Sequence, residues 1–306
     1  MASFRLIENS FSEVKHTDFF DKLALVAHNC YQVKEKDHEN NIGFITRLVQ
    51  SGHLAMMEHY RFAFVLNEKQ YHRFLELHNP FYELGEFMRV KGDYSEMVYL
   101  LSSSIRPILE NINSEDVLEK EMATLLGASL PVEVRSVLLP SLEGEKSVPL
   151  FDVEANKDKI PAEIYDRFTY VTYHLITDRG VTHELVRHRI CSFAQESTRY
   201  CNYTKDKFDA CLTFMKPSKY EERKEIYDSF YQKCADTYFE LIKEGATPDE
   251  ARAVLPNSLK ASIMVTCNLR EWKKIFALRT DPHAHFDIRR LMLLVMDDMK
   301  EKGYIK

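Results

Sequence analysis

Residues 187–200 read Arg-His-Arg-Ile-Cys-Ser-Phe-Ala-Gln-Glu-Ser-Thr-Arg-Tyr and place three arginines and one histidine in a chain with a formal net charge of -6. Such a concentration of cations in an acidic protein indicates an anionic ligand. Ser197 and Arg199 add a hydroxyl and a planar guanidinium, two groups that suit phosphate oxygens. We therefore interpret residues 187–200 as a phosphate-binding segment that follows a short helix.

Arginine-rich helix ends have a simpler interpretation, because most of them are only solvated. Arg187, His188 and Arg189 alone do not exclude it. The longer pattern is more specific, since Ser197 and Arg199 follow Arg189 at eight and ten residues with no proline between them.

The order of this segment, Arg187-His188-Arg189 and then Ser197 after seven further residues, resembles the signature of the flavin-dependent thymidylate synthases. Other blocks resemble the same family in the same order, and together they cover roughly residues 1–66 and 166–306. They are Gly52-His53 and Glu58-His59 before Arg61-Phe62-Ala63-Phe64, then residues 250–256, Asn268-Leu269-Arg270-Glu271-Trp272, Arg279 and His283.

The resemblance implies a methyltransferase that converts dUMP to dTMP. It implies methylenetetrahydrofolate as the one-carbon donor and NADPH as the reductant, with FAD carrying the electrons. No enzyme nucleophile is implied, because the reduced flavin supplies the hydride and an arginine polarises the uracil. A cytoplasmic homotetramer with active sites shared between chains is expected, without a nucleic-acid or membrane partner.

The resemblance also implies roles for individual residues of this sequence. The catalytic residues would be Arg279, near the pyrimidine, and His53, on the cofactor and folate side. The residues expected to contact FAD are Arg187, His188, Arg189, Glu58, Asn268 and His283. The residues expected to contact dUMP are Glu184, Gln195, Ser197, Arg199, Arg252 and Arg279, with Arg252 on the phosphate side.

Several of these residues also have purely structural interpretations. His53 follows Gly52 at a helix end, where it can cap carbonyls, and Asn268 is an ordinary helix cap on sequence grounds. Arg252 can pair with nearby carboxylates of its own helix. The two histidines at 283 and 285 match no metal motif, so no metal is predicted.

The sequence departs from the family pattern in two places. The segment 53–58 lacks the Ser-Pro that the family commonly places there. Gln195, followed by Glu196, stands where the family often has Glu, and an amide differs from a carboxylate in charge and in donors. Both departures bear on how the site is arranged. Lys274 stands where some relatives carry Asn, and it receives no role.

Composition is typical of a soluble intracellular enzyme. With 306 residues and 45% hydrophobic content, the chain can bury about three quarters of its unfolded surface. Its first residues contain no continuous apolar run, so we expect neither a secretory signal nor a membrane anchor. The six cysteines include no Cys-x-x-Cys pair, and Cys30, Cys191 and Ser192 have no recognisable nucleophile context. Nine glycines without a Gly-x-Gly-x-x-Gly argue against a Rossmann-type site.

The predicted fold class is α/β (α+β) and helix-rich, with a mixed sheet core flanked by helices. We expect one catalytic domain over residues 1–306, with residues 67–165 as a largely helical insertion of no assigned function. Strands are predicted at 60–66, 211–215 and 259–267 from alternating apolar residues. Predicted helices cover 17–31, 42–49, a segment after the Asn67–Gln70 capping box, 97–109, 117–130, 164–175, 183–190 and 226–241.

Local signals set the expected helix ends. Gly52, Gly180 and Gly245 are predicted helix stops. Thr182, Asn268 and the Thr247–Glu250 capping box are predicted helix starts. The Asp281-Pro282 pair is predicted to open the last helix.

Two other functions remain open at this stage. A nucleic-acid-binding module would use residues 187–203, with Tyr200 and Tyr203 stacking on bases, although net acidity argues against it. A catalytically silent relative would keep the fold as an interaction scaffold. Bound flavin and its chemistry with dUMP would exclude both.

Overall fold

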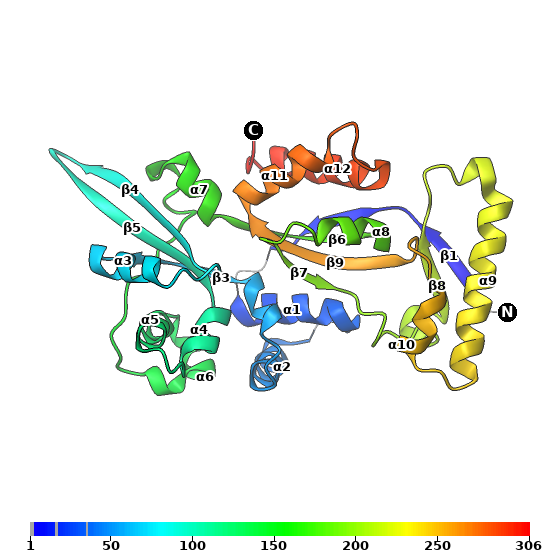
Figure 1. The fold of residues 1–306 in the computed structure, drawn as a ribbon, viewed down its shortest axis with the longest axis horizontal. Helices are drawn as coiled ribbons and strands as arrows, with labels where there is room; N and C mark the ends of the chain where they lie inside the picture. The colour runs from blue at the N-terminus through cyan, green and yellow to red at the C-terminus, as the bar shows by residue number, and fades with distance from the viewer. Residues whose placement is uncertain (1–2, 16–17, 35) are drawn as a thin grey trace.

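The computed structural model describes residues 3–15, 18–34 and 36–306, and its strands form three sheets (Figure 1). The central sheet is antiparallel and has the order β2 (Ser10–Glu13), β6 (Tyr170–Asp178), β9 (Lys260–Asn268), β7 (Ser192–Gln195). A second antiparallel sheet has the order β3 (Arg61–Leu66), β5 (Tyr94–Ser104), β4 (Glu83–Lys91). The third is a parallel pair of β1 (Ser3–Ile7) and β8 (Cys211–Met215).

Helices cover these sheets on both sides, as Figure 1 shows for the central one. One side carries α1 (Phe19–Tyr31) and α2 (His38–Gln50), and the other α11 (Leu269–Arg279) and α12 (Phe286–Glu301). The remaining α-helices are α3 (Glu68–Glu76), α4 (Arg106–Asn111), α5 (Val117–Ala128), α6 (Val132–Leu138), α7 (Ala162–Phe168), α8 (Arg179–Leu185), α9 (Lys224–Lys243) and α10 (Pro248–Ala251). Short 3₁₀ helices are η1 (Leu54–His59), η2 (Pro140–Leu142), η3 (Lys157–Lys159), η4 (Asp206–Phe208), η5 (Glu221–Arg223) and η6 (Arg252–Val254).

Apolar side chains gather in separate clusters under these sheets. The largest joins β6 and β9 to α7, α11 and α12 and includes the fully buried Trp272, whose indole N–H donates to the Val171 carbonyl at 3.2 Å. A second cluster joins α1 and β3 to α5 and β5, and a third packs α9 against β8. The predicted helix-rich α/β class is therefore confirmed, and none of the described helices is long and apolar enough to cross a membrane.

Most of the predicted elements are confirmed. The strands at 60–66, 211–215 and 259–267 correspond to β3, β8 and β9, and the predicted helix at 117–130 is α5. The Asn67–Gln70 capping box opens α3, and the Asn268 side chain accepts the Glu271 N–H at the start of α11. The start predicted at Thr17 lies outside the described residues.

The continuous helix predicted over 164–175 is wrong. The helix α7 ends at Phe168, and β6 begins at Tyr170. Spacings of three and four residues from Phe168 to Val171 and Leu175 fit a helix, but Val171, Tyr173 and Leu175 also fit a strand of period two. β6 buries the alternate residues Val171, Tyr173, Leu175 and Thr177, so the strand pattern is present in the sequence beside the helical spacing.

The helix stop predicted at Gly180 and the cap predicted at Thr182 are also wrong. Asp178 caps α8 by accepting the Val181 N–H at 2.7 Å, so Gly180 lies in the first turn of that helix. A Cβ at Gly180 would stand 3.1 Å from Asp178 Oδ1, so the absence of a side chain leaves room for the cap. The helix ends at Leu185, and the arginines that follow lie in a turn.

Two further boundaries differ from the prediction. The last helix begins at Phe286 with His285 as its cap, so Asp281-Pro282 precedes it as a turn. The helix predicted over 97–109 is instead the strand β5 followed by the short α4. From Leu100 to Ser104 β5 is buried on both faces, so its apolar run is continuous rather than alternating. The single domain and the insertion at 67–165 stay predictions.

Candidate active site

Three of the predicted site residues meet at the end of α8. Arg279, the last residue of α11, donates from Nη1 to Glu184 Oε2 at 2.8 Å and from Nη2 to the Glu184 carbonyl at 3.0 Å. Its Nε donates to His188 Nε2 at 3.1 Å. The guanidinium is therefore held in one plane by three contacts, which is the geometry that arginine provides and lysine does not.

His188 is buried and takes part in a longer polar chain. Its Nδ1 lies 3.9 Å from Glu271 Oε1, and Glu271 Oε2 lies 3.2 Å from Lys274 Nζ. Burial, and then the positive charge of Arg279, lower the pKa of His188, while Glu271 opposes them. The ring is therefore neutral near pH 7, and its contact with Arg279 assigns the proton to Nδ1.

The turn after α8 directs Arg187 and Arg189 to solvent. His188 N–H donates to the Leu185 carbonyl at 3.0 Å, and Cys191 N–H donates to the His188 carbonyl at 3.0 Å. These bonds turn the His188 ring inward and leave its two neighbours exposed. Within the described part of the chain, neither arginine has a carboxylate within ion-pair distance. Both guanidinium groups are available to an anionic ligand.

The strand β7 carries Gln195 beside α8, where its amide donates to Thr182 Oγ1 at 3.1 Å. Glu196, next along the chain, is buried and pairs with Lys260 Nζ at 2.5 Å, and it also accepts the Tyr203 hydroxyl at 3.0 Å. The carboxylate of Glu196 is thus used inside the protein. It does not replace the carboxylate that the family often has at position 195.

Ser197 and Arg199 lie at the next turn. The Ser197 N–H donates to the Cys30 carbonyl at 2.9 Å, which fixes this turn against the end of α1. Arg199 is exposed, its guanidinium lies 5.5 Å from the centre of the Tyr200 ring, and the Tyr200 ring lies 5.4 Å from that of Tyr31. The hydroxyl and the guanidinium thus sit close together in sequence on a fixed turn.

Glu58 is held between two regions of the chain. One carboxylate oxygen pairs with Arg106 of α4, and the other accepts the Ser192 hydroxyl of β7 at 2.9 Å. The segment without the family's Ser-Pro forms the 3₁₀ helix η1, which begins directly after His53. Glu58 is therefore in place beside the strand that leads to the candidate substrate residues.

The remaining predicted site residues are not brought into these contacts. His53 is exposed and its Nδ1 lies 2.9 Å from the Ser51 hydroxyl. Asn268 is buried as a helix cap and also donates to the Arg167 carbonyl at 3.1 Å. His283 has 97% of its side chain exposed and contacts Asp281, and Arg252 is exposed at the start of η6.

The sequence did not predict which charged side chains would pair with His188, Glu196 and Glu58. Glu271, Lys260 and Arg106 hold His188, Glu196 and Glu58 respectively. The Asn-x-x-Glu spacing from Asn268 to Glu271 marks a helix start, but it does not reveal that the carboxylate turns inward to a histidine. The other two pairs join residues 64 and 48 positions apart, which no local pattern connects.

The candidate nucleophiles are poorly suited to that role. Burial raises the pKa of Cys30 to about 11, so its thiol stays protonated near neutral pH. Cys191 is buried, and the Ser192 hydroxyl donates to the Glu58 carboxylate. The Glu58 carboxylate is also paired with Arg106, so it is already engaged and is not a free base for Ser192.

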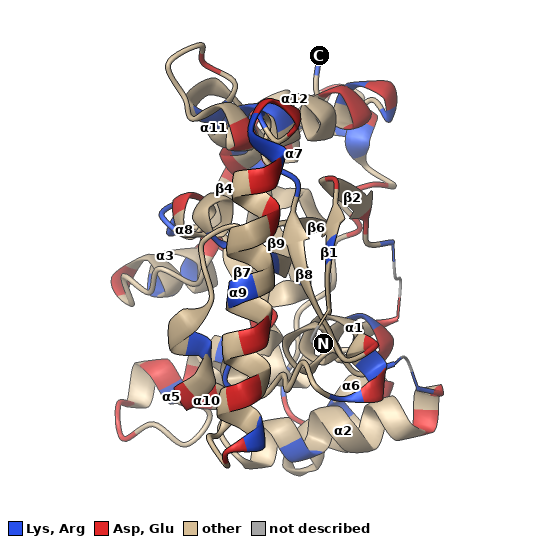
Figure 2. Ribbon diagram, turned by 90° about the vertical axis from the view of Figure 1, so that its right-hand side faces the viewer, with Lys and Arg blue, Asp and Glu red and all other residues tan. Residues whose placement is uncertain are grey.

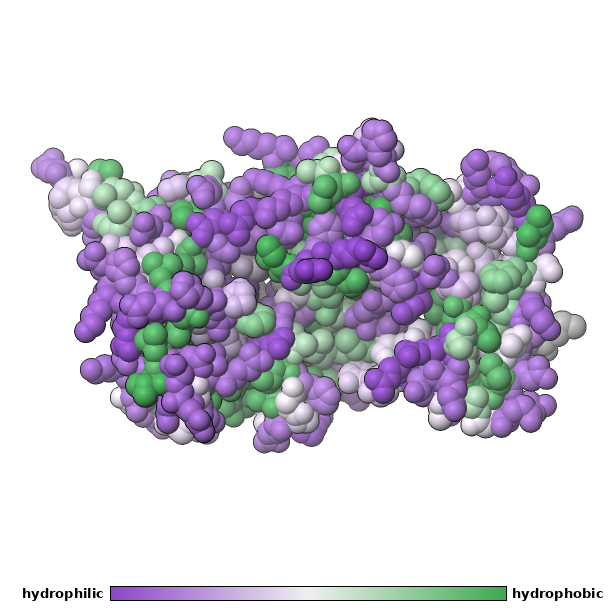
Figure 3. All heavy atoms as spheres, viewed as in Figure 1, coloured by the Kyte–Doolittle hydropathy of each residue, from purple (hydrophilic) through white to green (hydrophobic). Residues whose placement is uncertain are grey.

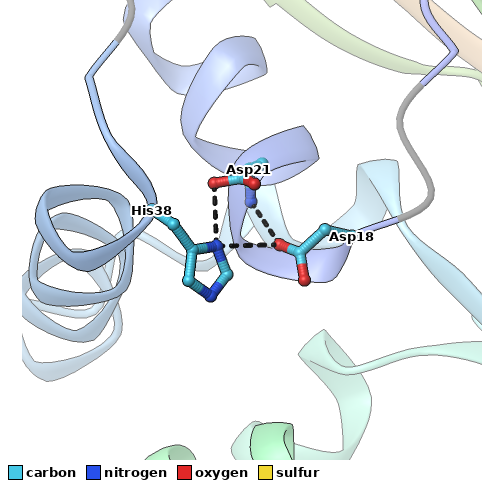
Figure 4. A group of neighbouring side chains, drawn as sticks. All are labelled: Asp18, Asp21 and His38. Carbon is cyan, nitrogen blue, oxygen red and sulfur yellow. Dashed lines mark hydrogen bonds and ion pairs between the residues drawn. The ribbon is translucent and has the colours of Figure 1, made fainter.

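One group of metal-ligand type lies elsewhere, where Asp18, Asp21 and His38 meet between α1 and α2 (Figure 4). His38 Nδ1 lies 3.1 Å from Asp21 and 3.6 Å from Asp18, and Nε2 lies 3.1 Å from Glu133. Asp18 also caps α1 by accepting the Asp21 N–H. These contacts fit an ion-pair cluster that joins α1, α2 and α6.

A known family matches the part of the chain that carries α8 and α11, and with them Glu184, His188 and Arg279. Residues 167–302 match the sequence model of a family described as thymidylate synthase complementing protein. The resemblance predicted from residues 187–197 is thereby confirmed over this part of the chain.

Individual relatives are each named flavin-dependent thymidylate synthase. The relative from Geobacter sulfurreducens is 40% identical over 113 residues, which are 37% of this chain and 48% of the relative. The relative from Pyrococcus furiosus is 35% identical over 131 residues, which are 42% of this chain and 53% of the relative. The relative from Sulfurisphaera tokodaii is 36% identical over 123 residues, which are 40% of this chain and 47% of the relative. The chain thus spans about half the length of the curated relatives it matches.

Proposed function

We propose that this protein is a flavin-dependent thymidylate synthase, a methyltransferase that converts dUMP to dTMP. The observation that carries the proposal is the arrangement at the end of α8. There Arg279 is fixed by Glu184 and His188, next to a turn that leaves Arg187 and Arg189 without acidic partners. This arrangement lies inside the part of the chain that is similar to the named relatives.

The residues present fit a flavin dinucleotide. Its pyrophosphate needs cations that are not already neutralised, and the exposed Arg187 and Arg189 meet that need. The backbone of His188 keeps the turn folded through its hydrogen bonds with Leu185 and Cys191. Glu58 offers a carboxylate near the end of η1. When bound, FAD would accept electrons from NADPH and deliver them as hydride to the substrate.

The protein's own residues would bind and polarise dUMP. Ser197 and Arg199 would hold phosphate oxygens, and Gln195 would offer amide hydrogen bonds to the pyrimidine. Arg279 would stabilise negative charge that develops on the uracil ring, because its guanidinium is already oriented before the substrate arrives. We keep Arg252 as a second phosphate contact and His53 on the folate side.

Three of the proposed residues contribute no contact to this cluster within the chain. His53 and His283 are exposed, and Arg252 lies on η6 beside α10. A homotetramer with shared active sites would bring these residues to the cluster of another subunit. Asn268 is engaged as a helix cap, so its proposed flavin contact is limited to the amide edge not used in capping.

The finer parts of the proposal follow the same reasoning. Methylenetetrahydrofolate would supply the one-carbon unit and NADPH the electrons, and the enzyme would work in the cytoplasm. Residues 1–306 would form one catalytic domain in which residues 67–165 are an insertion.

A nucleic-acid-binding function has less support. Figure 2 shows acidic and basic segments interspersed over the face it views, along α9 in particular, rather than one broad basic surface. Tyr203, one of the two proposed stacking residues, is buried and donates to Glu196. Neither feature suits binding to phosphates along an extended strand.

The visible spectrum of the purified protein tests the proposal. We expect a flavin absorption band that bleaches when NADPH is added without oxygen, then recovers as dTMP forms after addition of dUMP and methylenetetrahydrofolate. A control without dUMP should leave the flavin reduced. A protein that takes up no FAD and forms no dTMP would contradict the proposal. Bound flavin without dTMP would favour the catalytically silent scaffold.

A further inference from the structure

A cavity of about 650 Å³ lies where β3, the start of β6 and the carboxyl-terminal end of the chain meet. It is separate from the candidate active site, because no residue proposed to bind FAD or dUMP lines it. Part of its wall comes from Arg61, Ser102 and residues 151–157, which lie outside the family match. Its volume is in the range of pockets that hold small organic molecules.

Two cations in the cavity wall have no acidic partner. Lys22 of α1 and Arg61 of β3 have no carboxylate within ion-pair distance in the described part of the chain. Burial lowers the pKa of Lys22 to about 8, although Glu13 opposes the shift. A charged group that is removed from water and left unpaired is costly, and a bound anion would offset that cost.

Other charged groups of the wall are already paired or lie on an exposed loop. Glu13 lies 3.0 Å from Lys302 and 3.3 Å from Lys15, so these two lysines are largely neutralised. Two carboxylates, Asp152 and Glu154, lie on the same exposed loop as Lys157. Asp152 accepts the Ala155 N–H at 2.9 Å, and Glu154 accepts the Tyr165 hydroxyl at 2.9 Å.

Aromatic rings complete the cavity. Phe62, Phe168 and Tyr170 line it, and the Arg61 guanidinium lies 4.5 Å from the centre of the Tyr170 ring. Three hydrogen bonds from two nitrogens hold Arg61 in place. Its Nε donates to Ser102 Oγ at 3.1 Å, and its Nη2 donates to the Phe81 and Ser102 carbonyls. Its Nη1 has no protein acceptor among the described residues and remains available.

We propose that this cavity binds a small organic phosphate that carries a planar ring. The phosphate would accept from Lys22 and Arg61, and the ring would lie against Phe62, Phe168 and Tyr170. A phosphate monoester has a charge near -2, which matches two cations better than the single charge of a carboxylate does. The inference is independent of the proposed function.

Titration calorimetry of the flavin-loaded protein with phenyl phosphate tests this site. Lys22→Met keeps the apolar stem and removes the charge, and we expect binding about tenfold weaker. Lys120→Met removes an exposed lysine from another helix and should bind phenyl phosphate like the unchanged protein.

Further arms separate this site from the candidate active site and define its chemistry. Because phenyl phosphate shares its chemistry with dUMP, the titrations are repeated with Arg199→Gln, which should remove only binding at the candidate active site and leave binding that Lys22→Met weakens. Loss of all binding in Arg199→Gln would place the ligand at the candidate active site and overturn the inference. Inorganic phosphate should bind more weakly than phenyl phosphate, because it cannot use the aromatic wall. Equal effects of Lys22→Met and Lys120→Met, or benzoate binding as tightly as phenyl phosphate, would also overturn it. Thermal melts of each variant verify that it folds.

Discussion

Residues 67–165 and residues 167–302 each combine strands with helices, but they place their charged side chains differently. In the first region the ion pairs lie at the surface, as with Arg73–Glu121 and Arg89–Glu96. In the second, His188, Glu196 and Glu271 are buried. Exposed pairs contribute little to stability, whereas buried charged groups are costly unless they are held by partners. Of these two regions, the one that carries the candidate chemistry also has the costly arrangement.

On the face shown in Figure 3, hydrophilic side chains cover most of the surface, and apolar groups appear between them on the left, in the middle and over α9. Glu83 of the first region forms ion pairs with Arg167 and Arg270 of the second. Arg106 of the first region pairs with Glu58, whose other carboxylate oxygen accepts the Ser192 hydroxyl of the second. Four predictions test how separate the two regions are.

The largest expected effect is at Arg279. Arg279→Lys keeps the charge but loses the planar three-point attachment to Glu184 and His188, so turnover of dUMP should fall by about 10²–10³-fold. Flavin content, read from the visible spectrum, should change little. Arg290→Lys is the control, because Arg290 makes only a 3.5 Å pair with Glu8 at the surface. Retained turnover in Arg279→Lys would remove this residue from the reaction.

The second prediction concerns the core of the other region. Leu126 of α5 is fully buried, and Leu126→Ala should lower the free energy of unfolding by about 2–5 kcal/mol. Turnover per folded molecule should stay unchanged, because the cavity created lies away from α8. Urea unfolding and steady-state rates check both parts. Val117→Ala, on the same helix but 77% exposed, should be nearly neutral.

The third prediction tests the link that runs from Arg106 through Glu58 to Ser192. Arg106→Met leaves Glu58 with Ser192 as its remaining partner, and flavin affinity should fall about tenfold because a hydrogen bond to a charged group is lost. Fluorescence titration with FAD measures the change. Arg73→Met breaks an ion pair inside residues 67–165 and should leave flavin affinity as it was. Equal effects in the two variants would mean that the Arg106 contact has no particular part in the site.

The smallest effect is expected at His38, where α1, α2 and α6 meet. Hydrogen bonds to Asp21 and then Glu133 raise the pKa of His38 in the folded protein. Its contribution to stability is therefore complete below the unfolded value of about 6.5 and is lost as the pH rises through the folded value. Melting temperatures at pH 6 and pH 8.5 should differ less in His38→Gln than in the unchanged protein. His72→Gln should leave the difference intact.

Local signals predicted much of the fold because their physics is local. The Asn67 capping box, the Asn268 cap and the positive φ of Gly52 and Gly245 all depend on neighbouring residues. The failures at 97–104 and 170–178 have a different cause. Residues 100–104 are buried on both faces, which removes the alternation by which a strand is recognised. In 170–178 the alternation of Val171, Tyr173 and Leu175 is present, but Phe168, Val171 and Leu175 also have helical spacing.

The candidate site was predictable as a set of residues but not as a geometry. A motif places Arg187, His188 and Arg189 together, yet only the turn decides that the histidine points inward while both arginines face solvent. Likewise Gln195 and Glu196 are adjacent in sequence, but they lie on opposite sides of a strand end. Partners distant in sequence, such as Lys260 for Glu196, decide which side chain is used internally.

The pairing of β1 with β8 also has a consequence for synthesis of the chain. Ile7 aligns with Met215, so the first strand has no partner until about 200 more residues have left the ribosome. At about 5–20 residues per second this wait lasts about 10–40 s. During that time the strand presents unpaired backbone groups, which are a template for pairing with other chains. We therefore expect the nascent protein to depend on chaperones that shield its amino-terminal strand until β8 emerges.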